Sequence, residues 1–106
     1  MLRLEGELGC AELADVGAEL FRQVARGRIR IVLDLSAVPH LDYRGVRPLM
    51  SRAELLQRNG GDVKLVGLTP YLERVLYAGG AYQAFLSYRS VEAALAAFQL
   101  PLLRVA

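Results

Sequence analysis

The segment IRIVLDLSAVPHLDYRGVRPLM, residues 29–50, has the pattern of a strand that runs through a short loop into a helix. Its first part, 29–35, is almost continuously apolar and rich in β-branched residues, which is typical of a strand covered on both faces. Asp42 then stands where an N-cap is expected, before an amphipathic segment that starts near Arg44. Such a junction places polar side chains and free helix N–H groups at the carboxyl edge of a sheet, where α/β proteins usually carry their working surface.

The sequence on either side alternates strand-like and helix-like segments, with glycine or proline at most junctions. Residues 2–8 alternate apolar and charged side chains, which is typical of a half-exposed strand at or near a sheet edge. Further strands are expected at 29–35, 63–68 and 85–88, and helices at 12–26 and 44–58, after Thr69, and between Ser90 and Pro101. This order predicts an α/β fold with a mixed, mostly parallel sheet of about four strands and about four α-helices. We expect a single domain over residues 1–106.

Composition excludes several classes of protein. With 106 residues, 54% of them hydrophobic, the chain can build one core and is not expected to be disordered. A net charge of +2 and scattered arginines predict no nucleic-acid partner, and frequent charges in the apolar stretches predict no signal peptide and no membrane insertion. The single cysteine, Cys10, fits a reducing compartment, so we expect a cytoplasmic protein in which Cys10 is a small buried residue.

The residues that could support catalysis do not form a recognisable set. Asp34 is expected to accept hydrogen bonds from loop amides after its strand, and Ser36 has no evident base partner. No G-x-S-x-G elbow and no glycine-rich phosphate loop occur, and one histidine, His40, with one cysteine does not make a metal site. We therefore expect no enzyme activity, no cofactor and no metal. A small hydrolase or nucleotide-binding domain built on Asp34, Ser36 and Asp42 is the less favoured alternative.

A binding surface is the better interpretation of the junction. After the Asp42 cap, Tyr43, Arg44 and Arg47 would project from the first turns of the helix, and tyrosine and arginine are enriched in binding hot spots. An ordinary solvated first turn fits the composition equally well. His40 is expected in the loop, at an interface or partly exposed.

The motifs of this junction resemble those of the STAS domain family of anti-sigma-factor antagonists. Val32-Leu33-Asp34-Leu35-Ser36 is similar to the family's strand ending in D-L-[ST], and Leu41-Asp42-Tyr43-Arg44-Gly45 is similar to its loop ending in D-S-S-G. Three other segments agree in order and spacing, namely Gly6-Glu7-Leu8, Lys64-Leu65-Val66-Gly67-Leu68-Thr69-Pro70 and Val91-Glu92-Ala93-Ala94-Leu95. The resemblance extends over residues 2–98.

The resemblance implies a STAS fold and a non-enzymatic regulatory module that docks an anti-sigma factor or a histidine-kinase-like ATPase. The residues it implicates in partner binding are Pro39, His40, Asp42, Tyr43, Arg44, Gly45 and Arg47. A STAS subunit of a phospholipid-trafficking ABC transporter and a stressosome-type scaffold are the alternatives within the family. Whether the chain forms a homodimer stays open.

The sequence departs from the family pattern at two places. In the family, the serine directly after the motif aspartate is phosphorylated by the partner kinase; here that position is Tyr43, and Arg44 replaces the second serine. We therefore predict that the usual serine phosphorylation does not regulate this chain, and that Arg44 and Arg47 supply a fixed cationic site instead. The family also has a strand before its G-E-L segment, so we expect the N-terminal edge of the sheet to be truncated or paired by another subunit.

Overall fold

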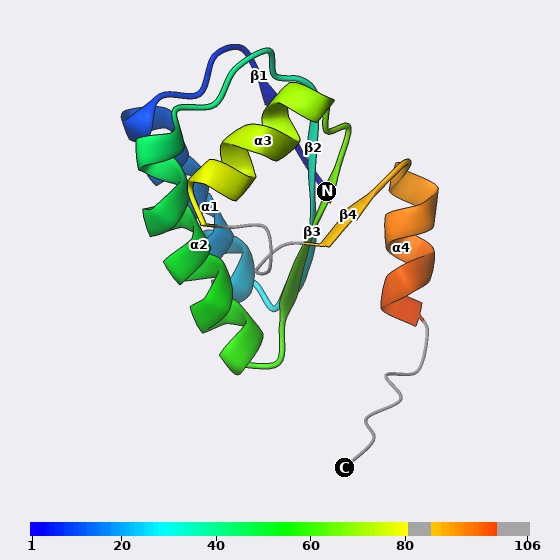
Figure 1. Cartoon of the computed structure of the whole chain (residues 1–106). Coiled ribbons are helices and arrows are strands. Elements are labelled where there is room, and N and C mark those ends of the chain that lie inside the picture. The colour runs from blue at the N-terminus through cyan, green and yellow to red at the C-terminus, as the bar shows by residue number, and fades with distance from the viewer. Residues whose placement is uncertain (81–85, 100–106) are drawn as a thin grey trace.

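The computed structural model describes residues 1–80 and 86–99, in which strands and helices alternate (Figure 1). The elements are β1 (Leu2–Glu5), α1 (Cys10–Ala25), β2 (Arg30–Ala37), α2 (Tyr43–Arg58), β3 (Asp62–Val66), α3 (Pro70–Ala78), β4 (Leu86–Tyr88) and α4 (Val91–Gln99). One sheet with the order β1-β2-β3-β4 contains all of these strands, and each neighbouring pair is parallel. The predicted α/β fold is confirmed. Of the predicted strand 85–88, residue 85 lies outside the described residues, as does Pro101.

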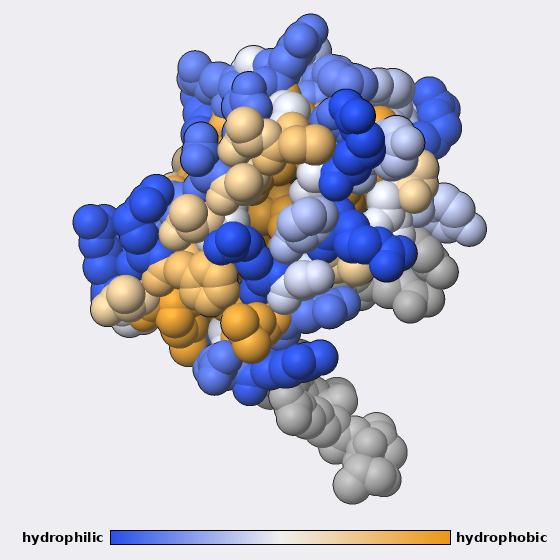
Figure 2. All heavy atoms as spheres, turned by 90° about the vertical axis from the view of Figure 1, so that its left-hand side faces the viewer, coloured by the Kyte–Doolittle hydropathy of each residue, from blue (hydrophilic) through white to orange (hydrophobic). Residues whose placement is uncertain are grey.

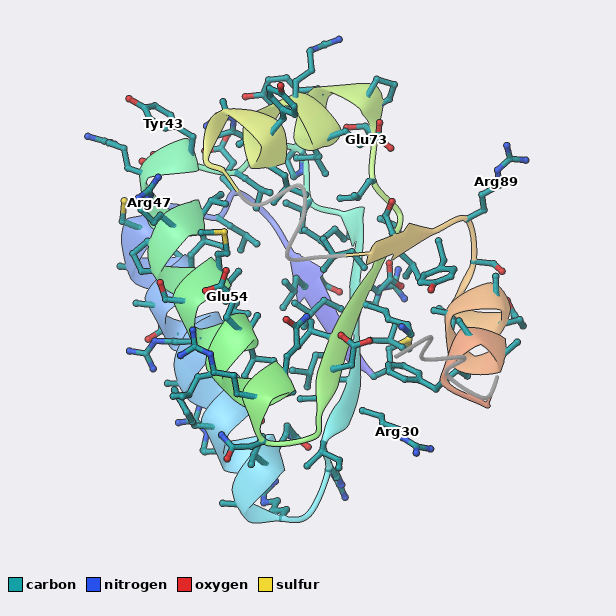
Figure 3. All side chains as sticks on the ribbon, turned by 60° about the horizontal axis from the view of Figure 1, so that its bottom comes forward. Arg30, Tyr43, Arg47, Glu54, Glu73 and Arg89 are labelled. Carbon is teal, nitrogen blue, oxygen red and sulfur yellow. The ribbon has the colours of Figure 1, made fainter. Side chains whose placement is uncertain are left out.

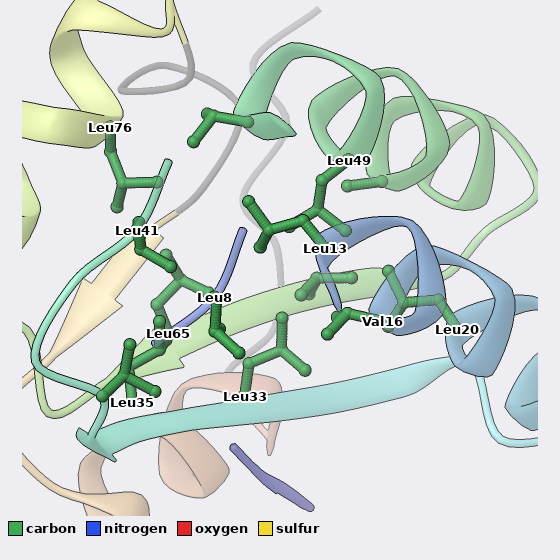
Figure 4. Close-up of a cluster of buried hydrophobic side chains, with 14 of the residues drawn as sticks. Leu8, Leu13, Val16, Leu20, Leu33, Leu35, Leu41, Leu49, Leu65 and Leu76 are labelled. Carbon is green, nitrogen blue, oxygen red and sulfur yellow. The ribbon is translucent and has the colours of Figure 1, made fainter. Parts of the chain in front are cut away.

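The helices cover the two faces of the sheet unequally. Helices α1, α2 and α3 lie on one face, and α4 is the one helix of the described residues on the other (Figure 1). The main core fills the space between the sheet and the first three helices (Figure 4), and its fully buried members include Leu13, Leu20, Leu33, Val46, Val63 and Leu72. A smaller core of Val32, Val66 and Ala94 lies under α4. Burial of this apolar surface is the main stabilising term of the fold.

The central strand β2 is buried on both faces, as its continuous apolar sequence predicts. Ile31 and Leu33 point into the main core, whereas Val32 points into the smaller one. Since successive side chains of a strand alternate between faces, an unbroken apolar run suits only a strand with helices on both sides.

Strand β1 forms one edge of the sheet and is shorter than the predicted segment 2–8. It ends at Glu5 because Gly6 adopts a φ of +76°. Beyond this turn, Leu8 pairs with Leu41 in an isolated parallel β-bridge. Leu2 and Leu4 pack half-buried against the main core, while Arg3 and Glu5 are exposed. The alternating pattern of an edge strand is therefore confirmed.

The helix starts agree with the sequence, with one exception. The Thr69 hydroxyl accepts a hydrogen bond from the Leu72 amide, which is the N-cap expected for α3. Helix α1 begins earlier than predicted, at Cys10, which makes Cys10 an exposed residue of the first helical turn. The expectation that Cys10 is buried is wrong, because the apolar stripe of α1 starts only at Leu13.

A lysine is buried on the face that α4 covers. Lys64 is 5% exposed, and its Nζ lies 2.8 Å from Oδ2 of Asp62. The same Nζ lies 4.6 Å from the ring centre of Phe98 on α4 and 5.4 Å from that of Tyr88 on β4. Burial alone would lower the pKa of Lys64, but the hydrogen bond and charge of Asp62, together with Tyr88, raise it above its ordinary value. The ammonium thus joins α4 to the sheet by cation–π contacts.

Seen from the side of α1 and α2, the surface mixes hydrophilic and apolar side chains, and strongly apolar ones gather in the lower part of the view (Figure 2). The two helices also meet through a cation–π contact, in which the Arg52 guanidinium lies 5.4 Å from the ring centre of the exposed Phe21. Over residues 1–80 and 86–99, no helix combines the length and the apolarity needed to cross a membrane.

Candidate functional site at the start of helix α2

The loop between β2 and α2 is held in place by the segment that precedes α1. The Leu8 amide donates to the His40 carbonyl at 3.0 Å, and the Asp42 amide donates to the Leu8 carbonyl at 2.8 Å. Leu41, between them, is buried in the main core. The loop is therefore anchored from both sides, which fixes where α2 begins.

Asp42 is the N-cap of α2, as predicted, and it also binds the side chain of Arg44. Oδ1 of Asp42 accepts from the Arg44 amide at 3.0 Å and from Nε of Arg44 at 3.1 Å, and Oδ2 accepts from Nη2 at 2.8 Å. The side-chain hydrogen bonds from Arg44, followed by the bond from its amide, hold the pKa of Asp42 well below its usual value. The carboxylate also raises the pKa of Arg44. The two charges largely compensate one another.

The glycine of the motif lies beneath the surface, between α1 and α2. A Cβ placed on Gly45 would lie 2.7 Å from Cδ1 of Leu13 and 3.1 Å from Cα of Cys10. Only glycine therefore allows the starts of the two helices to approach this closely. Cys10 makes the smallest contribution to the low pKa of Asp42.

Two of the predicted binding residues extend into solvent from the first turns of α2. Tyr43 is 58% exposed, and Arg47 is exposed one turn further along the helix; both point outward in Figure 3. Among the residues that the structure describes, no ion pair involves Arg47. This helix start therefore presents an aromatic ring and an uncompensated cation side by side.

Helix α3 completes the site with a residue that the sequence analysis did not single out. The Tyr71 ring stacks on the His40 ring with centroids 5.6 Å apart and an interplanar angle of 24°. A hydrogen bond also joins the Tyr71 hydroxyl to Nδ1 of His40. The pair borders an open depression of about 380 Å³, lined by His40, Leu41, Asp42, Tyr43, Arg44, Tyr71 and Val75.

The predicted site residues thus fall into three groups. His40, Asp42, Tyr43 and Arg44 line the depression. Pro39, which precedes them in the sequence, and Arg47, which follows them, are exposed but do not line it. Gly45 is buried beneath it. The helix start at Thr69-Pro70 could have identified Tyr71 from the sequence. A helix that follows β3 begins at the same edge of the sheet as α2, which places its first residues near the start of α2.

The carboxylates considered for catalysis are occupied by local hydrogen bonds. Oδ1 of Asp34 accepts from the Ser36 amide at 2.9 Å and from the Ser36 hydroxyl at 2.7 Å. The hydroxyl bond and then the amide bond hold the pKa of Asp34 below its ordinary value. Asp34 thus plays the loop-stabilising role that was favoured for it. Within residues 1–80 and 86–99, no cluster of His, Cys, Asp and Glu side chains is arranged to hold a metal ion.

Comparison with known proteins agrees with this fold. The model of the STAS domain family matches residues 1–94. BtrV of Bordetella bronchiseptica, which is named as an anti-sigma factor antagonist, is 34% identical over 101 residues, covering 95% of this chain and 87% of BtrV.

Two solved structures share the architecture. The crystal structure of TM1081 from Thermotoga maritima has a TM-score of 0.78 at 21% identity, covering 92% of this chain and 86% of that one. The phosphorylated form of SpoIIAA, a Bacillus cell fate determinant, has a TM-score of 0.64 at 21% identity, covering 91% and 86%. At these identities the two structures support the fold alone.

The sequence, the four-stranded sheet with its helices and the match over residues 1–94 lead to one assignment. This chain belongs to the STAS domain family, as a protein similar to the anti-sigma-factor antagonists.

Proposed function

We propose that this chain is a non-enzymatic bacterial binding module that acts in the cytoplasm and docks an anti-sigma factor or a histidine-kinase-like ATPase through the 39–47 surface. The observation that supports the proposal most is the arrangement around the depression. Exposed Tyr43 and the stacked pair of His40 and Tyr71 surround a floor that contains the buried Leu41. Aromatic rings around an apolar floor are typical of binding hot spots.

The chemistry of this surface indicates the chemistry of its partner. An apolar side chain of the partner would fit between Tyr43 and Tyr71, since both rings can contribute contact area at little entropic cost. Arg47 lies one helical turn after Tyr43, which lines the depression, and none of the ion pairs among the described residues involves it. A carboxylate of the partner next to the apolar anchor would therefore complement it.

Arg44 differs from its expected role. The sequence suggested that Arg44 and Arg47 together form a fixed cationic site, but the Arg44 guanidinium is already bound to Asp42. Arg44 thus stabilises the shape of the helix start, and Arg47 supplies the attraction for an acidic partner.

The same geometry supports the proposal that serine phosphorylation does not regulate this surface. The position of the family's acceptor serine is Tyr43, whose hydroxyl extends several ångströms further from the backbone. The two nearby serines are engaged elsewhere: the Ser36 hydroxyl donates to Asp34, and the Ser51 hydroxyl donates to the Arg47 carbonyl at 3.2 Å. A kinase that aligns its phosphate with a serine oxygen would find no acceptor at this helix start.

Binding measurements with a candidate anti-sigma factor of the same organism test the proposal. In titration calorimetry, we expect Tyr43→Ala to weaken binding by about tenfold or more. Leu95→Ala is the matched control, because Leu95 is exposed on α4, on the opposite face of the sheet, and its loss should leave the affinity unchanged. Equal affinities for wild type and Tyr43→Ala, or no binding by the wild type, would contradict the proposal.

The relatives also bear on the alternatives within the family. BtrV is named as an anti-sigma factor antagonist, which favours this function over a transporter subunit or a stressosome-type scaffold.

A further inference from the structure

The outer side of strand β1 offers a row of backbone groups for pairing. The Gly6 amide donates to the Ala37 carbonyl of β2, so the Glu5 carbonyl in the same trans peptide points the opposite way, out of the sheet. By the alternation of a strand, the N–H and C=O groups of Arg3 and Glu5 then all point outward. Within the described residues, β1 pairs with β2 alone.

The side chains of this edge are complementary to themselves. Arg3 and Glu5 are exposed on one face, and Leu2 and Leu4 lie half-buried on the other face, against the main core. Opposite charges two positions apart, with a leucine between them, match an antiparallel copy of the same strand. Charged side chains, lysine above all, and prolines usually protect an edge strand from pairing, but here the two charges are of opposite sign and can pair with those of a second copy.

We propose that two copies of this chain associate through β1, in antiparallel register about a two-fold axis at Leu4. In that register Arg3 lies opposite Glu5 of the second copy, and Glu5 lies opposite its Arg3. These are the residues whose backbone groups point outward, so each pair exchanges two hydrogen bonds, as antiparallel strands require. A closed symmetric dimer with one continuous sheet results.

Both faces of the new strand pair gain from this register. On the charged face, two Arg–Glu cross-strand pairs form, and Arg3 also lies beside its own register partner Asp34, so each arginine is placed between two carboxylates. On the apolar face, Leu4 meets Leu4 of the second copy as a non-hydrogen-bonded pair, in which the Cα atoms approach to about 4.5 Å. The half-exposed Leu4 side chains of the two copies then cover one another.

A register-specific disulfide tests the pairing directly. In a Cys10→Ser background, Leu4→Cys should form a disulfide-linked dimer under mild oxidation, because its Cα separation suits a disulfide. Leu2→Cys is the matched control: in the proposed register the two copies of position 2 are offset by four residues, about 13 Å, and should not cross-link. Equal cross-linking at both positions, or none at position 4, would overturn the register.

Charge reversal tests the same interface without a covalent bond. Arg3→Glu and Glu5→Arg should each weaken the dimer by roughly tenfold or more in analytical ultracentrifugation, because like charges then lie directly opposite one another. A mixture of the two variants should restore the dimer, since positions 3 and 5 of the two chains then again carry opposite charges in both cross-strand pairs. Circular dichroism establishes that both variants are folded. A wild type that stays monomeric at NMR concentrations, or a mixture no better than its components, would refute the proposal.

Discussion

The carboxylate of Asp42 holds the guanidinium of Arg44 by two hydrogen bonds, at 3.1 and 2.8 Å, while it also caps the helix that contains Arg44. One side chain thus performs two tasks at the start of α2. It satisfies a free helix N–H group, and it holds the guanidinium of an arginine whose side chain is 70% exposed. The shape of the proposed docking surface depends on this pair.

Removing the carboxylate of Asp42 should destabilise the start of α2. We expect Asp42→Ala to lower the melting temperature by roughly 5 °C, because the N-cap is lost, and Asp42→Asn to lower it less, because an amide oxygen can still accept from the Arg44 amide. Thermal unfolding followed by circular dichroism measures both. Equal losses for the two variants would show that the ion pair with Arg44, rather than the cap, is the important contact.

The low pKa of Asp42 predicts how this contribution depends on pH. A carboxyl group with a depressed pKa stabilises the fold above its unfolded-state pKa, near 3.8, and loses that effect as the pH falls through the lower folded-state value. The stability difference between wild type and Asp42→Asn should therefore stay constant from neutral pH to about pH 5 and shrink below it. A difference that vanishes already at pH 6 would contradict the assignment.

Tyr43→Ser should create a serine phosphorylation site at the start of α2, where the wild-type residue is a tyrosine. The change restores a serine directly after Asp42, at the free N–H groups of α2, where a phosphate is favourable. Incubation with the cognate anti-sigma kinase and ATP, followed by mass spectrometry, should find phosphate on the variant alone. Phosphate on any wild-type residue from 36 to 51 would show that the surface is regulated after all.

The stacked pair of His40 and Tyr71 should contribute to partner binding. We expect Tyr71→Ala to weaken binding by about tenfold, whereas Tyr71→Phe keeps the stacked ring and should weaken it less than about threefold. Tyr77→Ala is the control, since Tyr77 is exposed on the same helix but does not line the depression. Equal effects of the Tyr71 and Tyr77 changes would argue against a specific role for the pair.

Gly45→Ala should destabilise the fold, opposite to the usual effect of this change in a helix. In an exposed helix interior alanine is favoured over glycine by about 1 kcal/mol. At Gly45 the added Cβ would meet Leu13 at 2.7 Å and the backbone of Cys10 at 3.1 Å, so we expect a loss of about 1–3 kcal/mol. Urea unfolding measures the change in the free energy of unfolding. An increase would contradict the prediction, because it would mean that α1 and α2 can move apart at no cost.

Lys64 allows the packing and the charge of a buried side chain to be separated. We expect Lys64→Ala to lower the free energy of unfolding by about 2 kcal/mol, because it leaves a cavity under α4. Lys64→Met should change it by less than about 1 kcal/mol, since methionine fills a similar volume and the Asp62 carboxylate that loses its partner is 35% exposed and stays hydrated. Urea unfolding at neutral pH compares them, and equal losses for both would assign the stability to the ammonium.

The raised pKa of Lys64 adds a prediction at alkaline pH. A lysine with a raised pKa stabilises the fold below its unfolded-state pKa, near 10.5, and this effect is lost as the pH rises through the folded-state value. Wild type should therefore lose stability above about pH 10.5 relative to Lys64→Met. If the free energies of unfolding of the two proteins change equally with pH above 10.5, the charge of Lys64 has no role in stability.

Local patterns in the sequence predicted most of the fold and part of the site. The apolar periodicity located all helices and strands, and the N-caps at Asp42 and Thr69 set two helix starts, because these signals depend on residues close in the chain. The contact between His40 and Tyr71 joins residues 31 positions apart, so it depends on the packing of α3, which no local pattern encodes. The rotamer that turns Arg44 back onto Asp42 is likewise a choice among several that the sequence permits.

The contrast between Gly45 and Tyr43 has a consequence for how such a module can change over time. Gly45 is confined by the main core, so its replacement would be selected against through folding alone. Tyr43 projects into solvent, and a serine or a tyrosine there leaves the core untouched. Within one short motif, the residue that the fold requires and the residue proposed to decide phosphorylation are therefore under separate constraints. A single exposed position can exchange serine for tyrosine by drift while the fold remains as stable as before.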